Sequence, residues 1–264
     1  MLVGAPSSWQ LGLQESATPV MVQTAQLMQR TNALLLPISV ITPIAIAALC
    51  AAFRGKRANA PKGAGGVSAS APLEMAWTAL PLALLASICA PSLKVLRYQL
   101  ARKRRPFAIV RVTAHQWYWR YDYVVDGKRL GFNSAALADN ERVKFSKTNL
   151  AIYPKLLATD YELVLPARRV VRLLITSADV IHSFSVPSFG VKTDAIPGKL
   201  NDTWIKVFQP GVYYGQCAEF CGVGHAFMPI GVRVVSQREF KAWSKLALAS
   251  VSRAFEELRR GALR

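Results

Sequence analysis

The first hundred residues contain two long runs without a charged side chain. The first run, 33–53, has 21 residues and the second, 75–93, has 19. A helix of 21 residues is about 32 Å long, enough to cross a hydrocarbon core of about 30 Å. Apolar runs in buried helices of soluble proteins are shorter, about 10 to 14 residues. We therefore expect two membrane-spanning helices, at about 33–53 and 75–97, that form a hairpin.

From about residue 106 the pattern changes to short runs of β-branched and aromatic residues separated by turn residues. Several strands at such spacing predict an antiparallel sandwich or barrel. The expected strands are 108–112, 117–125, 162–165, 170–175, 202–208, 211–215 and 230–235. Apolar residues with helical spacing then predict one amphipathic helix over 236–260. The expected domains are an extramembrane segment (1–31), a transmembrane hairpin (32–105), a β domain (106–235) and a C-terminal helix or tail (236–264).

The chain is strongly basic, with a formal net charge of +18. From residue 107 onward, 22 Lys and Arg outnumber 13 Asp and Glu. Such an excess accompanies nucleic-acid binding in many proteins, but no recognition motif is present here. We therefore expect no nucleic-acid partner.

The most informative chemistry lies in the twelve positions from Cys217 to Met228, which also include Cys221 and His225. Thiolate and thioether sulfur favour copper, whereas zinc sites usually close with four Cys or His ligands. A blue-copper site uses one Cys, so the second Cys would have no role. Two thiolates four residues apart can instead bridge two copper ions.

A dicopper site needs a second imidazole, from His115 or His182. His182 follows the β-branched run 170–175 and precedes a turn-rich stretch, so we place it where a strand meets a loop. His115 lies among aromatic residues with no sulfur nearby. His182 is therefore the preferred ligand. The alternative for the cysteines alone is a disulfide or a redox couple.

Three blocks of the chain, 115–123, 182–201 and 213–230, resemble subunit II of haem-copper cytochrome c oxidases, which carries the binuclear copper A centre. The resemblance covers roughly 30–240. It implies a membrane-anchored all-β protein, with a two-helix transmembrane hairpin followed by a cupredoxin-like Greek-key β-sandwich or barrel. In that fold the metal ligands come from loops at one end.

The resemblance also implies a ligand set for two copper ions. It consists of two bridging thiolates, two terminal imidazoles, one axial thioether and one backbone carbonyl: Cys217 and Cys221, His182 and His225, Met228, and Glu219. The carboxylate of Glu219 is implied to reach a magnesium or manganese ion shared with subunit I. Haems are expected only in the partner subunit.

The same resemblance implies roles for other residues. Trp117 is expected to receive electrons from cytochrome c, and Asp194 to support the region of the interface metal. Glu74 resembles a glutamate at the mouth of a proton channel, although a simple interfacial glutamate fits as well. A local acidic spot could dock a basic cytochrome c, with Asp122, Asp160 and Asp179 as candidates. The basic chain also fits an acidic or membrane-bound cytochrome.

The leading hypothesis is the electron-input subunit of a proton-translocating respiratory oxidase. Its expected partners are subunit I, other oxidase subunits, cytochrome c and membrane lipid, in a bacterial inner membrane with the dicopper domain on the periplasmic side. One alternative is a membrane-tethered copper chaperone, although such proteins place their His after the cysteines. Another is the copper A domain of a different electron-transfer enzyme, such as nitrous oxide reductase.

Overall fold

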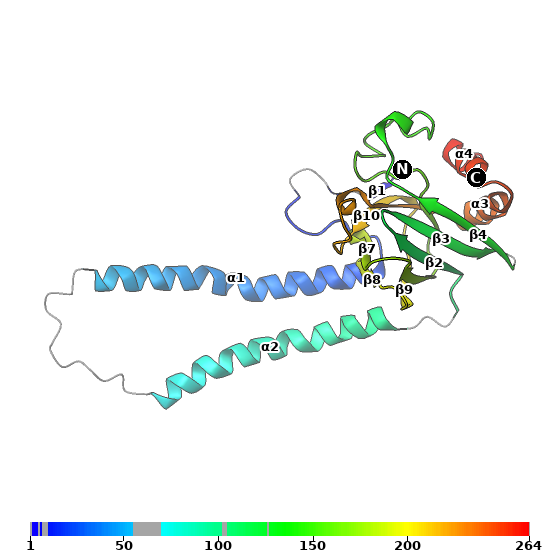
Figure 1. Cartoon of the computed structure of the whole chain (residues 1–264). Helices are drawn as coiled ribbons and strands as arrows, with labels where there is room; N and C mark the ends of the chain where they lie inside the picture. The colour runs from blue at the N-terminus through cyan, green and yellow to red at the C-terminus, as the bar shows by residue number, and fades with distance from the viewer. Residues whose placement is uncertain are drawn as a thin grey trace. The chain divides into compact units, whose positions relative to one another are not determined.

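A computed structural model describes residues 2–4, 6, 10–54, 70–101, 105–125 and 127–263. The chain divides into two compact units. One unit, Thr24–Arg97, holds most of two long helices, and the other combines Met1–Gln23 with Tyr98–Arg264 and holds the β domain (Figure 1). The turn of the expected hairpin falls largely on 55–69, outside the described residues.

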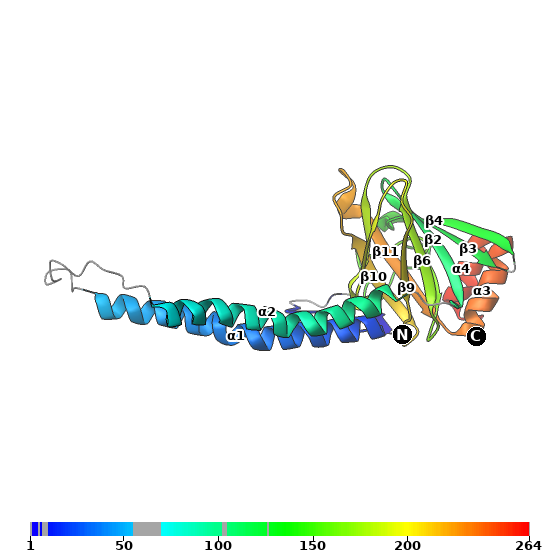
Figure 2. The same cartoon turned by 90° about the horizontal axis from the view of Figure 1, so that it is seen from below.

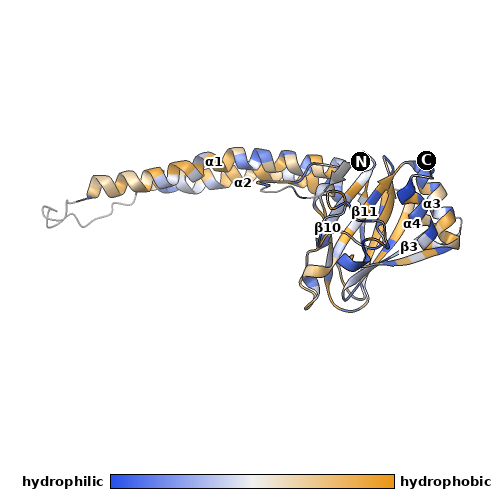
Figure 3. Cartoon of the chain, turned by 90° about the horizontal axis from the view of Figure 1, so that it is seen from above, coloured by the Kyte–Doolittle hydropathy of each residue, from blue (hydrophilic) through white to orange (hydrophobic). Residues whose placement is uncertain are grey.

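The two long helices are α1 (Pro19–Phe53) and α2 (Ala71–Leu100), which run in opposite directions. Each contains an 18-residue window of high mean hydropathy, 2.4 and 1.8, in which no residue is buried. Hydrophobic residues make up much of the two helices, with hydrophilic residues between them (Figure 3). Both are long and apolar enough to cross a membrane, and their internal prolines are tolerated in such helices. The predicted spans 33–53 and 75–97 lie within them.

Helix α1 begins well before its apolar run because of a cap. The Thr18 hydroxyl accepts the Met21 N–H at 3.1 Å and donates to the Phe189 carbonyl at 2.6 Å. Pro19 occupies the first helical position, where a missing N–H costs nothing. The first turn of α1 is therefore anchored to the β domain.

The β domain consists of two sheets that face each other. One has the strand order β4-β3-β2-β6-β9, and the other β5-β11-β10-β7-β8 with β1 beside β10. Their bounds are β1 (Leu2–Gly4), β2 (Ala108–His115), β3 (Tyr118–Val125), β4 (Lys128–Ser134), β5 (Leu163–Pro166), β6 (Val171–Ser177), β7 (His182–Val186), β8 (Val191–Ala195), β9 (Asn201–Ile205), β10 (Gly211–Cys217) and β11 (Pro229–Val235). Short 3-10 helices are η2 (Asp139–Glu141), η3 (Pro187–Phe189) and η4 (His225–Phe227).

All seven predicted strands have a counterpart, but β1, β4, β7 and β8 were not predicted. Strand β4 alternates correctly, with Leu130 and Phe132 buried, yet Lys, Arg, Gly and Asn fill its other positions. Strand β7 begins with two polar residues, His182 and Ser183, that are both fully buried. The hydropathy pattern alone therefore does not predict these strands.

The core lies between the sheets and follows the alternation of the strands. Val110 and Val112 of β2 point inward, beside Trp119 and Tyr121 of β3. The sandwich, with the predicted metal-binding loop, 218–228, between its last two strands, is the cupredoxin-like arrangement expected from the sequence.

Two C-terminal helices, α3 (Gln237–Ala249) and α4 (Val251–Arg260), replace the single helix that we predicted. Ser236 and Glu239 form a reciprocal capping box at the start of α3. The helix ends because Ser250 adopts an extended backbone and its hydroxyl accepts the Arg253 N–H at 3.4 Å. Trp243 packs against Phe132 and Phe255, which joins both helices to the sandwich (Figure 2).

A buried cluster of charges joins the loop after β4 to β11. The Glu162 carboxylate lies 2.9 Å from both Lys147 Nζ and Arg233 Nη2, and all three side chains are almost fully buried. Lys147 also donates to the Thr159 carbonyl at 2.6 Å, and Arg233 to the Tyr153 hydroxyl at 2.8 Å. Burial raises the pKa of Glu162, but the charges of Arg233 and Lys147 outweigh it and lower the pKa to about 2.

We predict that Glu162→Gln destabilises the β domain by about 3 to 5 kcal/mol, because it leaves two buried cations without a counter-charge. Denaturant unfolding of the full chain in detergent, followed by tryptophan fluorescence, measures this. The matched control is Glu256→Gln, which breaks an exposed ion pair with Arg260 and is expected to cost about 1 kcal/mol or less. Equal effects of the two substitutions would contradict the prediction.

The same charge predicts a pH dependence. The folded pKa of Glu162 is below its ordinary value of 4.5, so its contribution is complete above pH 4.5 and is lost as the pH falls toward 2. The unsubstituted chain should therefore lose more stability between these values than Glu162→Gln. The difference between the two unfolding free energies, measured across that range, checks the sign.

Candidate metal centre

The predicted ligands come together because three strands meet at one end of the sandwich. Cys217 ends β10, and Met228 lies immediately before β11. The loop between them is closed by a hydrogen bond from the Cys217 N–H to the Met228 carbonyl, at 3.0 Å. Strand β7 pairs with β10 so that Phe184 lies opposite Cys217, which places His182 beside the loop.

The two thiols lie between two imidazoles. The Sγ atoms of Cys217 and Cys221 are 3.9 Å apart. His182 Nδ1 lies 3.9 Å from Cys217 Sγ, and His225 Nδ1 lies 3.5 Å from Cys221 Sγ. Each cysteine therefore faces its own histidine, as the predicted ligand set requires.

Two weaker ligands were also predicted. The backbone carbonyl of Glu219 is 3.3 Å from Cys217 Sγ, while the Glu219 side chain is exposed. Met228 is buried in the same apolar cluster as Cys217 and Cys221. The Glu219 carbonyl is thus near a sulfur, and the Met228 carbonyl accepts the Cys217 N–H. Their roles as ligands stay predictions.

The arrangement fits copper. Cys217 and Cys221 are free thiols, far beyond the separation of about 2 Å in a disulfide. Their separation is also less than twice a metal–thiolate bond of roughly 2.3 Å, so one metal ion can contact both. Sulfur and imidazole donors with a thioether nearby match the preference of copper.

The two thiols have different pKa values. Burial raises the pKa of Cys217, but hydrogen bonds with His182 and with the backbone at Glu219 outweigh it and lower the pKa to about 6. Burial and the charge of Cys217 raise the pKa of Cys221 to about 12. The two pKa values are therefore shifted in opposite directions, and a bound cation favours the loss of both protons.

The turn between β2 and β3, within the aromatic block 115–123, supports the loop. The Trp117 indole N–H and the Gln116 side-chain amide both donate to the Cys221 carbonyl, at 3.1 and 2.9 Å. Gly222 has φ +113°, and a side chain at Gly224 would overlap the Trp117 ring. Trp117 thus lies directly against the metal-binding loop.

Asp179 joins this block to a ligand. One of its carboxylate oxygens lies 2.8 Å from His182 Nε2, and the other accepts the Gln116 backbone N–H at 2.7 Å. A carboxylate on the second nitrogen of a ligand histidine fixes the ring and its tautomer. We expected Asp179 only as a docking residue. Its spacing of three residues before His182 was the signal for this contact.

The other predicted residues lie elsewhere. His115 stacks on the Tyr118 ring, with centroids 4.6 Å apart. Asp122 pairs with Arg120 at 3.0 Å. The remaining acids are dispersed: Asp160 accepts the N–H groups of Ala135 and Tyr161, Asp194 of β8 lies 3.7 Å from Lys192 Nζ, and Glu74 is exposed in the first turn of α2.

The chain is similar to known proteins over most of its length. Residues 108–235 match the family "Cytochrome C oxidase subunit II, periplasmic domain", and residues 6–95 match its transmembrane domain. A probable cytochrome c oxidase subunit 2 of Rickettsia bellii is 37% identical over 244 residues, covering 90% of this chain and 84% of the relative. One of Rickettsia conorii is 38% identical over 242 residues, covering 90% and 72%.

Solved structures are similar as well. The periplasmic domain of cytochrome oxidase subunit II of Bradyrhizobium japonicum is 42% identical, with a TM-score of 0.49, and covers 56% of this chain and 97% of that one.

The family matches span both the apolar helices and the sandwich, so the chain is a membrane protein with a periplasmic domain. They do not favour the copper-chaperone alternative. The His and Cys cluster fits a copper A centre. This chain belongs to the cytochrome c oxidase subunit II family.

Proposed function

We propose that this chain takes electrons into an oxidase: reduced cytochrome c docks near Trp117, an electron enters a dicopper centre, and it passes to haem in subunit I, where oxygen is reduced to water. The observation that carries the proposal is the pair of free thiols flanked by His182 and His225. When bound, two thiolate-bridged coppers spread one electron over two metals and two sulfurs, so little reorganisation accompanies transfer.

The chain's own residues hold that centre in a fixed geometry. Cys217 and Cys221 would supply two thiolates, and His182 and His225 would each supply an imidazole. Met228 and the Glu219 carbonyl would be the weaker ligands. Asp179 holds the His182 ring, which limits its movement between oxidation states.

Trp117 is the proposed point where electrons arrive. Its ring is partly exposed, and its N–H bonds directly to the carbonyl of Cys221. Around it the metal-binding loop exposes Phe220, Val223 and Phe227, by 77, 89 and 57%. An exposed apolar patch of this kind marks a protein-binding surface. The indole therefore lies at the proposed docking surface and forms one hydrogen bond to the loop that carries the predicted ligands.

Charge around this surface sets the rate at which the donor arrives. The acids proposed for docking are Asp122, Asp160 and Asp179, and each already has an internal partner. An ion-paired carboxylate offers less net charge to a partner. The positive charge of the domain is therefore also consistent with an acidic or membrane-bound cytochrome as the electron donor.

Glu219 connects the centre to the partner subunit in this proposal. Its exposed carboxylate would bind magnesium or manganese shared with subunit I, because these hard cations prefer oxygen ligands. Asp194 supports this region, and Glu74 serves as the mouth of a proton channel.

The proposed setting is a bacterial inner membrane, consistent with the bacterial relatives. Lipid and other oxidase subunits would cover the exposed apolar helices. The proposed domains are 1–31, 32–105, 106–235 and 236–264.

We predict two coppers per chain that share one unpaired electron in the oxidised protein. Cys217→Ser and His182→Ala should each abolish that signal, because each removes a ligand of the pair. Copper content and electron paramagnetic resonance of the full chain measure this. Cys89→Ser, an exposed cysteine of α2, is the matched control and should leave both unchanged. One copper per chain, or a Cys217–Cys221 disulfide in metal-loaded protein, would contradict the proposal.

We predict that Trp117→Phe slows electron transfer from cytochrome c by about tenfold or more, or about 1.4 kcal/mol of barrier. The substitution removes the indole hydrogen bond to Cys221 and shortens the ring. Stopped-flow oxidation of cytochrome c by the assembled oxidase measures the rate. Trp77→Phe in α2 is the control. An unchanged rate in Trp117→Phe, with a normal copper signal, would exclude this path.

A further inference from the structure

Both apolar helices join the β domain at the end of the sandwich opposite the metal centre. At that end β7 finishes and η3 follows, and the Phe189 carbonyl of η3 accepts the Thr18 hydroxyl at the start of α1. His182 lies at the other end of β7. Helix α2 finishes where the Trp204 indole of β9 donates to the Gln99 carbonyl at 3.0 Å, and residues of both helices line one cavity there with Trp204. Both spans therefore enter the domain beside one set of turns.

The turns at this end, which we call the basal end, are placed by strand register. Val171 of β6 pairs with Ala108 of β2 and with Ile205 of β9. The connection from β3 to β4 lies beside the start of β2. Arg169 Nε donates to the Gln237 side chain at the start of α3, at 2.8 Å. The basal end comprises residues 105–108, 125–129, 166–172, 202–210 and 236–239.

The basal end carries a large positive excess, since its eight Lys and Arg outnumber three Asp and Glu. Among the residues that the structure describes, only one of these cations forms an ion pair, that of Arg172 with Asp202 at 2.6 Å. Asp126 lies outside the described residues and counts here by its charge alone. The cations are Arg105, Lys128, Arg129, Arg168, Arg169, Arg172, Lys206 and Arg238, and the acids are Asp126, Asp202 and Glu239.

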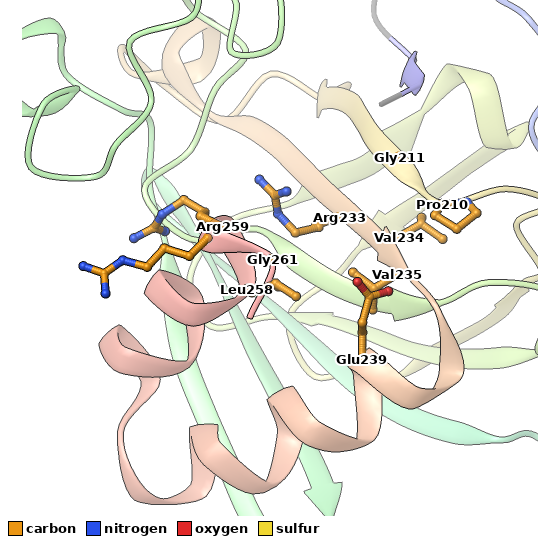
Figure 4. A pocket seen from close by; sticks show the side chains of 10 residues that line it. Pro210, Gly211, Arg233, Val234, Val235, Glu239, Leu258, Arg259 and Gly261 are labelled. Carbon is orange, nitrogen blue, oxygen red and sulfur yellow. The ribbon is translucent and has the colours of Figure 1, made fainter. Parts of the chain in front are cut away.

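Neighbouring acids do not cancel this excess. Helix α4 finishes near the basal end, where Leu258 lines a cavity with Pro210 (Figure 4). Residues 256–260 contain two glutamates and two arginines, so they add no net charge. Glu15 interacts with Tyr213 of β10 and lowers the excess from five charges, eight minus three, to four. The excess is therefore a property of the whole end rather than of one side chain.

Aromatic side chains accompany this charge beside the end of α2. The Tyr98 and Trp204 rings meet edge to face, with centroids 5.5 Å apart. The guanidinium carbon of Arg169 lies 5.6 Å from the centroid of the Phe107 ring. Trp and Tyr concentrate at the headgroup level of membranes, and clustered Lys and Arg next to a span attract anionic lipid. The basal end has both features.

We propose that the basal end binds the headgroups of anionic phospholipids, of the phosphatidylglycerol class, in the periplasmic leaflet of the membrane. Arginine suits these headgroups, because its N–H groups form charge-assisted bonds to phosphate oxygens. Attraction to an anionic membrane falls off within a Debye length, about 8 Å at physiological salt, so cations close to the spans contribute most. The bound lipid holds the domain against the membrane. This inference goes beyond the proposed function and is independent of copper and of electron transfer.

Hydrogen exchange of the full chain in lipid nanodiscs tests the proposal. The amides of 167–170 and 206–210 should exchange at least about threefold more slowly in phosphatidylglycerol discs than in phosphatidylcholine discs of equal ionic strength. Arg168→Gln combined with Arg169→Gln should abolish this difference. Lys144→Gln combined with Arg253→Gln is the matched control, because both side chains are exposed and lie outside the basal end, and it should keep the difference.

Two further measurements separate lipid binding from a folding defect. Lys128→Gln combined with Arg129→Gln changes a different turn and should weaken the same lipid effect. In sodium chloride of about 1 M, where the Debye length is about 3 Å, the difference between the lipids should vanish for the unsubstituted chain. Equal exchange in both lipids at low salt, or an equal lipid effect in the Arg168 and Arg169 double variant and in its control, would overturn the proposal. The copper signal is measured separately, so this test and that of the metal centre fail independently.

Discussion

The antiparallel pairing of β7 with β10 is the constraint on which the metal centre depends. It places Phe184 opposite Cys217 and thereby sets His182, two residues earlier, beside the metal-binding loop. The loop itself is fixed at both ends, because the Cys217 N–H bonds to the Met228 carbonyl. The predicted ligands, from residues 182 and 217–228, therefore come from β7, the end of β10 and the loop that contains η4. The sandwich builds the site, and the long apolar helices serve the membrane.

Burial makes charge costly in the β domain, because water cannot screen it. At the metal centre, burial raises the pKa of both cysteines, and hydrogen bonds with His182 and with the backbone at Glu219 outweigh this effect at Cys217. At Glu162, the charges of Arg233 and Lys147 outweigh burial, so the carboxylate keeps its charge even when buried.

The metal ligands could be predicted from the sequence, whereas the strands and contacts that position them could not. Cys217, Cys221, His225 and Met228 lie in one short segment, and His182 stood out among three histidines. Strand β7 escaped prediction because two of its four buried residues, His182 and Ser183, are polar. The buried Lys147 was equally invisible, because its burial depends on Glu162, fifteen positions away, rather than on local pattern. The break at Ser250 reflects a side-chain cap that periodicity does not encode.

The carbonyl of Cys221 is where the aromatic block and the metal-binding loop share one acceptor, with Gln116 and Trp117 as donors. Gly222 and Gly224 keep the loop thin enough for the indole to lie against it. The loop alone therefore does not define the shape of the site, because Gln116 and Trp117, a hundred residues upstream, also contact it. Transplanting positions 217–228 into an unrelated sandwich would carry the sulfur donors but not the shape that holds them, unless the host also supplied the indole and the amide.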